Sequence, residues 1–494
     1  MGDIDFLEEK NLPAVAPSIS LGKTSVAVIS KILQGFKRIT GLDAGFRIPY
    51  YFIGSPLSTW EPLVVLEQLR TLDIVEDGGT FTRDYPDEPN LIRFGVKNKN
   101  IDSTIHNASE SGLHGGGFHF SSLERATWAA VGEAVERQAL LHFKPAFPRR
   151  ASFISIKKEA LDIFSLAGIS PETRNGDARF ALNEDDVFTW EKGYSLTQNR
   201  HLFIPLQLLK LNRHYEKSEE KILRIFVSTG AAVHQTLDHA LVGGILEAIE
   251  RDAFMITWMN RLTPVQINLE TIDDADLQKA LSAFKRYRLT PYLLHLPTDF
   301  PVHVVLCVLI DETGVGPAVV VGANADFNVV GACRKALTEA LASRLFIRHT
   351  YDNRKKNNET LTFSKPESIW RVERLLIWSS PAMIPHIEFL LKNTPKSIVD
   401  IKTVREPKNA TEKKEVLVRS FKEKNMELCY SNILSDVVQQ KTNLHGVVVI
   451  APKLQPLHLF EGIPYSHGER MASVPKLFGF TPASAPNPLP HPFP

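Results

Sequence analysis

The sequence predicts a mixed α/β (α+β) fold in which helices pack on β-sheets. Two observations carry this prediction. Between residues 106 and 350, short apolar runs typical of strands alternate with segments of helical apolar spacing. The 494-residue chain is also 43% hydrophobic and 23% charged, as globular proteins are. This length is enough for one large domain or two to three ordinary ones.

We divide the chain into four segments by composition and pattern. An N-terminal accessory region is followed by a core of alternating helices and strands, a charged helical region, and a final strand that leads into a proline-rich tail. The segments are residues 1–105, 106–350, 351–440 and 441–494.

The individual elements follow from local patterns. Residues 61–79 have helical apolar spacing and end in Gly-Gly, which predicts a helix with a stop. The charged, Asn-rich stretch YDNRKKNNET (351–360) is typical of a solvated loop, and we expect mostly helix over residues 366–440. Short apolar runs rich in valine predict buried strands. These runs are VHVVLCVLI (302–310), GPAVVVGA (316–323) and GVVVIAP (446–452).

Charge and cysteine usage exclude several classes of protein. A net charge of +1 gives no case for nucleic acid or for an anionic membrane surface. No apolar run reaches the ~18 residues of a membrane span, and the acidic start MGDIDFLEEK is unlike a signal peptide. The three cysteines are far apart and form no CxxC pair, so neither disulfides nor a structural zinc site is indicated. We expect a cytoplasmic protein.

An acidic helical motif occurs twice. GEAVERQAL (132–140) and LEAIERDAF (246–254) share the pattern E-A-x-E-R-x-A. In a helix, the two glutamates and the arginine of each copy lie on one face. The two sets are Glu133, Glu136 and Arg137, and Glu247, Glu250 and Arg251.

Both helices are apolar around the rest of their circumference, which predicts that they are buried. Buried carboxylates repel one another unless a cation is present, and Mg²⁺ prefers carboxylate and phosphate oxygens. The repeat therefore indicates a magnesium and nucleotide site; the alternative is a pair of solvated Glu–Arg contacts. A third helix, residues 332–348, carries Glu339 and Arg344 but by itself is compatible with ordinary core packing.

The segment HGGGF (114–118) is similar to the oxyanion-hole segment of lipases and esterases. Those enzymes also need a G-x-S-x-G nucleophile elbow, and the nearest candidate, GYSLT (193–197), lacks the second glycine. A hydrolase is therefore an outside alternative.

Several motifs together resemble the YcaO-domain family. Three long stretches, which include both acidic copies, resemble the three motif regions of that family in order. They span residues 115–140, 228–254 and 321–344. The stretch 447–470 and the terminal PNPLPHPFP (486–494) resemble one branch, the azoline-forming cyclodehydratases or D proteins of thiazole- and oxazole-modified peptides.

The resemblance implies a YcaO-type fold whose sheets and helices enclose an ATP site. It implies Mg²⁺ ligands at the four motif glutamates and arginines near the phosphates, with further nucleotide contacts. The metal ligands are Glu133, Glu136, Glu247 and Glu250; the ATP-binding residues are Arg137, Arg251, Arg344, Ser228, Gln235 and Glu339.

The resemblance also implies a reaction and partners. The reaction is ATP-dependent cyclisation of Cys, Ser or Thr in a ribosomal precursor peptide. The partners are an E1-like protein that binds the leader peptide, the precursor itself and an FMN-dependent dehydrogenase. Two alternatives stay open: a YcaO enzyme that forms thioamide or amidine, and a non-catalytic scaffold subunit. The scaffold is suggested by Ala232, His239 and Ala342, where family members often have other residues.

The tail, residues 486–494, cannot be helical, because its prolines fix φ and lack an N–H. A disordered end is the ordinary expectation for such a terminus. The resemblance instead implies that the tail enters the active site, which makes Pro490, Pro492 and Pro494 catalytic-site candidates.

Overall fold

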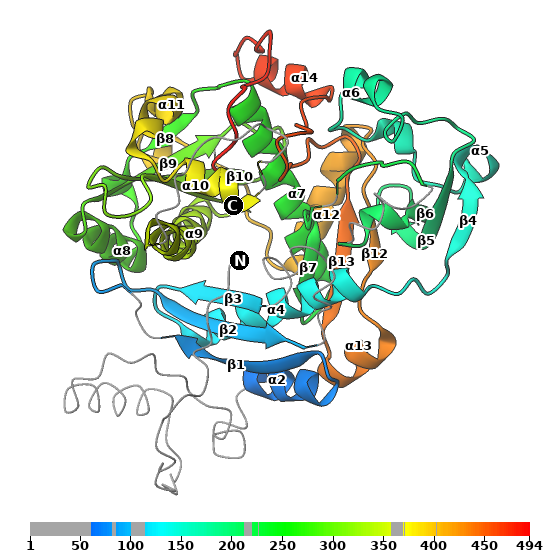
Figure 1. Ribbon diagram of the computed structural model, residues 1–494, viewed down its shortest axis with the longest axis horizontal. Helices are drawn as coiled ribbons and strands as arrows, with labels where there is room; N and C mark the ends of the chain where they lie inside the picture. The colour runs from blue at the N-terminus through cyan, green and yellow to red at the C-terminus, as the bar shows by residue number, and fades with distance from the viewer. Residues whose placement is uncertain are drawn as a thin grey trace, which may run out of the picture. The chain divides into compact units, whose positions relative to one another are not determined.

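The computed structural model describes most of the chain, which forms two compact units (Figure 1). The described residues are 61–81, 85–99, 114–211, 220–225, 227–356, 369, 371–401 and 403–494. Unit 1 comprises residues 1–138 and 435–443, and unit 2 comprises residues 139–434 and 444–494. The units cut across the four segments expected from the sequence, and residues 1–60 of the expected N-terminal region lie outside the described residues.

Unit 1 is built on a three-stranded antiparallel sheet in the order β1-β2-β3. Its elements are α2 (Glu61–Thr71), β1 (Val75–Phe81), β2 (Ile92–Asn98), β3 (His114–His119), most of α4 (Leu123–His142) and α13 (Asp436–Thr442). The helix predicted at 61–79 is wrong beyond Thr71, because Asp73 takes a left-handed conformation (φ 62°) and ends it. Gly78 and Gly79 therefore lie in a strand.

The glycines of β3 allow the strand to lie directly against α4. A Cβ at Gly117 would be 1.7 Å from the carbonyl oxygen of Ala126, and one at Gly115 would be 2.3 Å from that of Ala130. HGGGF is thus explained by strand–helix packing, which gives no support to the hydrolase alternative.

Unit 2 contains two antiparallel sheets. One has the order β4-β5-β12-β13-β7, with β6 also paired to β5, and the other has the order β11-β10-β9-β8. The strands are β4 (Arg149–Ser152), β5 (Val187–Ser195), β6 (Arg200–Pro205), β7 (Ala231–His234), β8 (Val265–Ile267), β9 (Leu289–Leu296), β10 (His303–Asp311), β11 (Val319–Asp326), β12 (Cys429–Asn432) and β13 (His445–Ile450).

One helix links these two sheets: α7 (Leu237–Met259) contacts β7 and β13 of one and β11 of the other (Figure 1). A single apolar cluster extends from α7 to β9, β10, β11 and β13. The other helices are α5 (Phe153–Ile156), α6 (Pro171–Gly176), α8 (Ala275–Arg286), α9 (Val329–Lys356), α10 (Arg371–Ile377), α11 (Ile384–Ile387), α12 (Ala410–Glu423) and α14 (Arg470–Leu477).

The mixed α/β prediction and the buried strands are confirmed: every residue of β10 is buried, and β13 covers most of the run predicted at 446–452. The loop predicted at 351–360 is wrong as far as Lys356, because α9 continues to that residue. Residues 366–440 hold α10, α11 and α12, but also the unexpected strand β12. Among the described residues, no helix combines the length and apolarity needed to cross a bilayer.

Candidate active site

Glu247 lies in the middle of α7 and is held by close backbone packing. Its carboxylate accepts a hydrogen bond from the Gly230 backbone N–H (3.0 Å) and one from Arg251 Nη2 (3.2 Å). Gly230 has φ +87°, and a Cβ there would lie 2.2 Å from the carbonyl oxygen of Val449. A Cβ at Gly244 would lie 2.4 Å from the Gly230 carbonyl oxygen. Gly244 is therefore required by the approach of α7 to the turn before β7, whereas a Cβ at Gly243 would make only an ordinary contact with Ala232 (3.4 Å).

Two further carboxylates belong to the same cluster. Burial, and then the neighbouring Glu339 carboxylate, raises the pKa of Glu250 well above its ordinary value; Arg251 acts in the opposite direction. Desolvation, with a contribution from Glu247, raises the pKa of Glu339 to about 7. Glu339 is exposed to solvent, which weakens this rise in its pKa, whereas Glu250 is 5% exposed. Neighbouring helices thus bring three acids together.

Arg251 is the arginine of this acidic cluster. Its Nη2 reaches Glu247, its Nε lies 3.4 Å from Glu250, and the ring of Phe493 covers its guanidinium at 4.3 Å. The Nε is buried and has no hydrogen-bond acceptor of good geometry among the described residues. Three acids beside one arginine leave negative charge that a divalent cation would balance, and such a cation can carry the phosphates of a nucleotide. The residues of unit 2 therefore fit both Mg²⁺ and a nucleotide.

Unit 1 repeats the arrangement on α4. Glu133 accepts from the Gly116 backbone N–H (2.6 Å) and from Arg137 Nε (2.9 Å). In both units the donor glycine precedes its glutamate by 17 residues, and the arginine follows four residues later. Glu136 lies one turn further along α4 and is half-buried.

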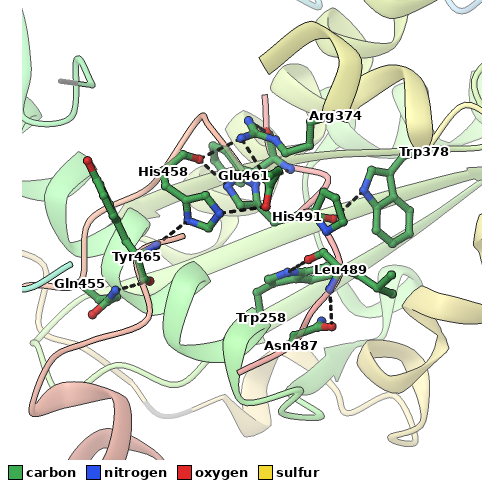
Figure 2. A network of polar contacts seen from close by, with 12 residues as sticks. Trp258, Arg374, Trp378, Gln455, His458, Glu461, Tyr465, Asn487, Leu489 and His491 are labelled. Atoms are coloured by element: carbon green, nitrogen blue, oxygen red, sulfur yellow. Dashed lines mark hydrogen bonds and ion pairs between the residues drawn. The ribbon is translucent and has the colours of Figure 1, made fainter. Parts of the chain in front are cut away.

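The C-terminal tail is extended and docked within unit 2, so the expectation of a disordered end is wrong (Figure 2). Trp378 Nε1 donates to the carbonyl oxygen of Pro490 (2.9 Å), and Trp258 Nε1 donates to that of Leu489 (3.2 Å). Arg374 Nη2 donates to the carbonyl oxygen of Phe493 (2.9 Å). Pro492 is buried as well, and the terminal Pro494 is half-buried.

Comparison with known proteins decides the family. The family model described as YcaO cyclodehydratase, ATP- and Mg²⁺-binding, matches residues 119–455, more than half of the chain. The chain belongs to the YcaO family. ATP and Mg²⁺ are accordingly the cofactors of this family, as the sequence motifs predict. No curated protein sequence matches the chain.

Solved structures confirm the YcaO fold. A heterocyclase in complex with substrate and cofactor is 19% identical with a TM-score of 0.70; the match covers 88% of this chain and 57% of that one. YcaO from Methanopyrus kandleri, bound with AMPPCP and Mg²⁺, is 16% identical with a TM-score of 0.54; the match covers 83% of this chain and 95% of that one. A chain of the microcin synthetase McbBCD complex of E. coli is 13% identical with a TM-score of 0.55 (76% and 88% covered). This YcaO protein thus spans little more than half the length of the first of these chains.

The nucleotide-binding residues predicted around β7 lie at both ends of that strand. Ser228 is in the turn before it, where its carbonyl oxygen accepts from the Ala231 N–H (2.9 Å). Gln235 follows the strand and is half-buried. His234 and His239 stack at 4.4 Å beside Gln235.

Arg344 has different surroundings from Arg251. It is 2% exposed, and its guanidinium binds Asp311 (2.6 Å) and the carbonyl oxygen of Pro317 (2.7 Å). These contacts favour a role in stabilising unit 2 rather than the predicted contact with phosphate.

A second polar cluster lies where the tail docks. His458, Glu461 and His491 have potential ligand atoms within 4.8 Å of one another. Both ring nitrogens of each histidine already have partners, and the Arg374 guanidinium is 3.7 Å from Glu461. Because the ring nitrogens are already engaged within the protein, we assign this cluster to anchoring of the tail (Figure 2).

Reasoning from the acidic pattern alone missed Glu339 as a member of the cluster, because its helix lacks the E-x-x-E-R motif. One signal could have found it: Gly322 precedes Glu339 by 17 residues, the spacing of the other two copies. A Cβ at Gly322 would lie 2.3 Å from the backbone N of Ala340, so this glycine also brings a strand against a helix. No pattern in the sequence indicated Arg374 or Phe493.

Proposed function

We propose that this YcaO protein is the ATP-dependent cyclodehydratase subunit that converts Cys, Ser or Thr residues of a ribosomal precursor peptide to thiazolines or oxazolines. The observation that carries the proposal is Glu250, a carboxylate buried beside two other acids with one arginine in contact. Such a group needs a cation, and a metal-bound nucleotide would supply one.

The proposed reaction consumes one ATP for each ring. The thiol or hydroxyl loses its proton as it attacks the carbonyl carbon of the preceding amide, and the resulting oxyanion takes the γ-phosphoryl group of ATP. The amide nitrogen then expels phosphate to form the C=N bond of the azoline, and its proton is released. The products are the ring, ADP and phosphate, so the peptide loses one water.

Protein groups would act by charge and position, as is general for phosphoryl transfer. Glu247, Glu250 and Glu339 would hold Mg²⁺, which offsets charge on the phosphates when bound. Arg251, in contact with Glu247 and Glu250, would add positive charge beside the phosphates. In unit 1, Glu133 and Glu136 are proposed as metal ligands on the strength of the repeated motif.

The tail and the partners complete the proposal. The carbonyl contacts of Pro490 and Phe493 hold the end of the tail in place, which supports a role for Pro490, Pro492 and Pro494 at the reaction site. We expect an E1-like partner, a precursor peptide and an FMN-dependent dehydrogenase. The 57% coverage of a heterocyclase chain and the likeness to a chain of the McbBCD complex, one structure of which has pro-MccB17 bound, support the need for further components.

The test is mass spectrometry of a Cys- and Ser-rich precursor incubated with this protein, its E1-like partner, ATP and Mg²⁺. We expect a loss of about 18 Da for each ring, since one water leaves on covalent cyclisation. The variant Glu250→Gln should reduce ring formation by a factor of about 100 or more, since it removes a charge that positions the metal.

The matched control is Glu469→Gln, because the Glu469 side chain is 87% exposed. It should keep wild-type rates. A product whose mass rises by the difference between a sulfur atom and an oxygen atom would instead identify thioamide formation. Full activity of Glu250→Gln would contradict the metal assignment, and no ATP turnover with any precursor would favour a scaffold subunit.

A further inference from the structure

We infer that Phe493 is a positioning residue: its ring fixes the Arg251 guanidinium against the acidic cluster, so that docking of the tail completes the metal- and phosphate-binding site. The inference rests on the proposed function for its consequence in nucleotide binding. The contact between Phe493 and Arg251 is independent of that function.

The geometry around Arg251 supports this role. The guanidinium carbon lies 4.3 Å from the centroid of the Phe493 ring, within the range of a cation–π contact. A ring over one face of a guanidinium leaves the N–H groups free in its plane. Two of these groups face Glu247 (3.2 Å) and Glu250 (3.4 Å). The ring therefore selects one orientation of the arginine without occupying its donors.

Phe493 is itself held firmly. It is 1% exposed, and its ring packs on that of Phe254 at 4.6 Å. Its carbonyl oxygen accepts from Arg374, and its N–H donates to His491 Nδ1 (3.3 Å). Arg374 Nη1 and His491 Nε2 both donate to the carbonyl oxygen of His458, so the end of the tail and the segment at His458 share one network (Figure 2).

The coupling between docking of the tail and the orientation of Arg251 must act in both directions. If the docked tail stabilises the active orientation of Arg251, then Arg251 stabilises the docked tail by the same factor. Loss of the ring should weaken nucleotide binding, and loss of the guanidinium should loosen the tail even when no ligand is present.

A double-mutant cycle tests the first consequence. The variants are Phe493→Leu, Arg251→Met and both together, and the measurement is calorimetric binding of AMPPCP in the presence of Mg²⁺. We expect Phe493→Leu to weaken binding by about threefold to thirtyfold, the range of a cation–π contact. Phe493→Tyr, which keeps the ring, should restore wild-type affinity. In the Arg251→Met background, Phe493→Leu should have no further effect.

Hydrogen exchange of the C-terminal peptide tests the second consequence in the ligand-free protein. Arg251→Met should speed exchange at the Phe493 amide. The control Leu489→Ala removes another tail side chain, whose residue contacts Trp258 and not Arg251. It should weaken nucleotide binding less than Phe493→Leu does.

Additive effects of Phe493→Leu and Arg251→Met on affinity would overturn the inference, as would equal weakening by Leu489→Ala and Phe493→Leu. The two proposals fail in different ways. If the wild-type protein bound no nucleotide, the proposed function would fail, and the exchange measurement would still decide whether Arg251 holds the tail.

Discussion

Arg251 and Arg344 are both arginines of unit 2, but their surroundings differ. The Arg344 guanidinium is 2% exposed and binds one carboxylate and one carbonyl oxygen. Arg251 lies beside three acids, with its Nε 3.4 Å from Glu250, and is covered on one face by a ring. The sequence motif treats the two arginines alike, because it records spacing along a helix and not the partner that each side chain meets.

A buried ion pair predicts the effect of changing Arg344. Arg344→Met would leave the Asp311 carboxylate buried without its cation, which costs about 3–5 kcal/mol of stability. Urea unfolding should show this loss, while the folded fraction should keep its affinity for Mg²⁺ and ATP. Arg344→Met combined with Asp311→Leu should recover part of the loss, because no charge is then left unpaired. Lower nucleotide affinity with unchanged stability would instead support the contact with phosphate.

At the scale of elements, three strand–helix pairs share one design. In β3–α4, β7–α7 and β11–α9, a glycine in or just before the strand precedes a helical glutamate by 17 residues. The first two glycines donate their N–H to that glutamate. In the third pair, the backbone of Ala323, beside Gly322, hydrogen-bonds to Glu339 and counteracts the rise in its pKa. In each pair, backbone in or just before the strand that lies close to the helix therefore hydrogen-bonds to the glutamate carboxylate.

This design predicts that Gly322→Ala is harmful. The new Cβ would lie 2.3 Å from the Ala340 backbone N, and neither backbone can move without separating β11 from α9. We expect a loss of about 1–3 kcal/mol from overpacking and weaker nucleotide binding, because Glu339 moves with its helix. Gly176→Ala, at the exposed end of α6, meets nothing within 4 Å and is the control. Equal stability of the two variants, measured by thermal unfolding, would contradict the packing argument.

The elements also differ in how well the sequence predicts them. The repeated E-A-x-E-R-x-A helices and the valine-rich strands were predictable, since each pattern is local. The end of α2 was not, because it depends on a left-handed residue at Asp73 that continued apolar spacing conceals. The proximity of Glu339 to Glu250 depends on the packing of α7 and α9 against β11, an edge strand. No local pattern encodes this packing. Proline content predicted the extended tail, but its burial depends on Arg374, Trp378 and Trp258.

At the scale of the molecule, unit 2 holds the half-buried His295 and the buried His491 as neutral imidazoles. Burial, and then the neighbouring His303, lowers the pKa of His295 to about 4. His491 is 1% exposed, and burial followed by the Arg374 cation lowers its pKa well below the ordinary value. Each ring is engaged as a neutral group: His491 donates from Nε2 and accepts at Nδ1. The core and the tail anchor therefore both depend on uncharged imidazole.

This burial predicts acid sensitivity. In the unfolded chain, His295 takes up a proton near pH 6.5, whereas in the folded protein it does so only near pH 4. Between these values the unfolded state binds more protons, so stability falls as the pH falls, by at most about 1.4 kcal/mol per pH unit for one histidine. Glu339 acts in the opposite direction: its raised pKa of about 7 makes the folded state gain stability as the pH falls from 7 towards 4.5. The dependence of wild-type stability on pH is therefore the sum of two opposed effects.

A comparison of the wild type with His295→Gln separates the effect of His295 from that of Glu339. His295→Gln cannot titrate, so the difference in free energy of unfolding between wild type and variant isolates His295. At pH 7.5 the variant should be the less stable, because it loses the contact of His295 Nε2 with His303 Nδ1 (3.1 Å). Urea unfolding at steps between pH 7.5 and 4.5 should show this advantage of the wild type shrinking only below about pH 6.5, where the unfolded histidine becomes charged. A difference that stays constant across the whole series would mean that His295 takes up its proton equally in both states, and would contradict the neutral buried imidazole.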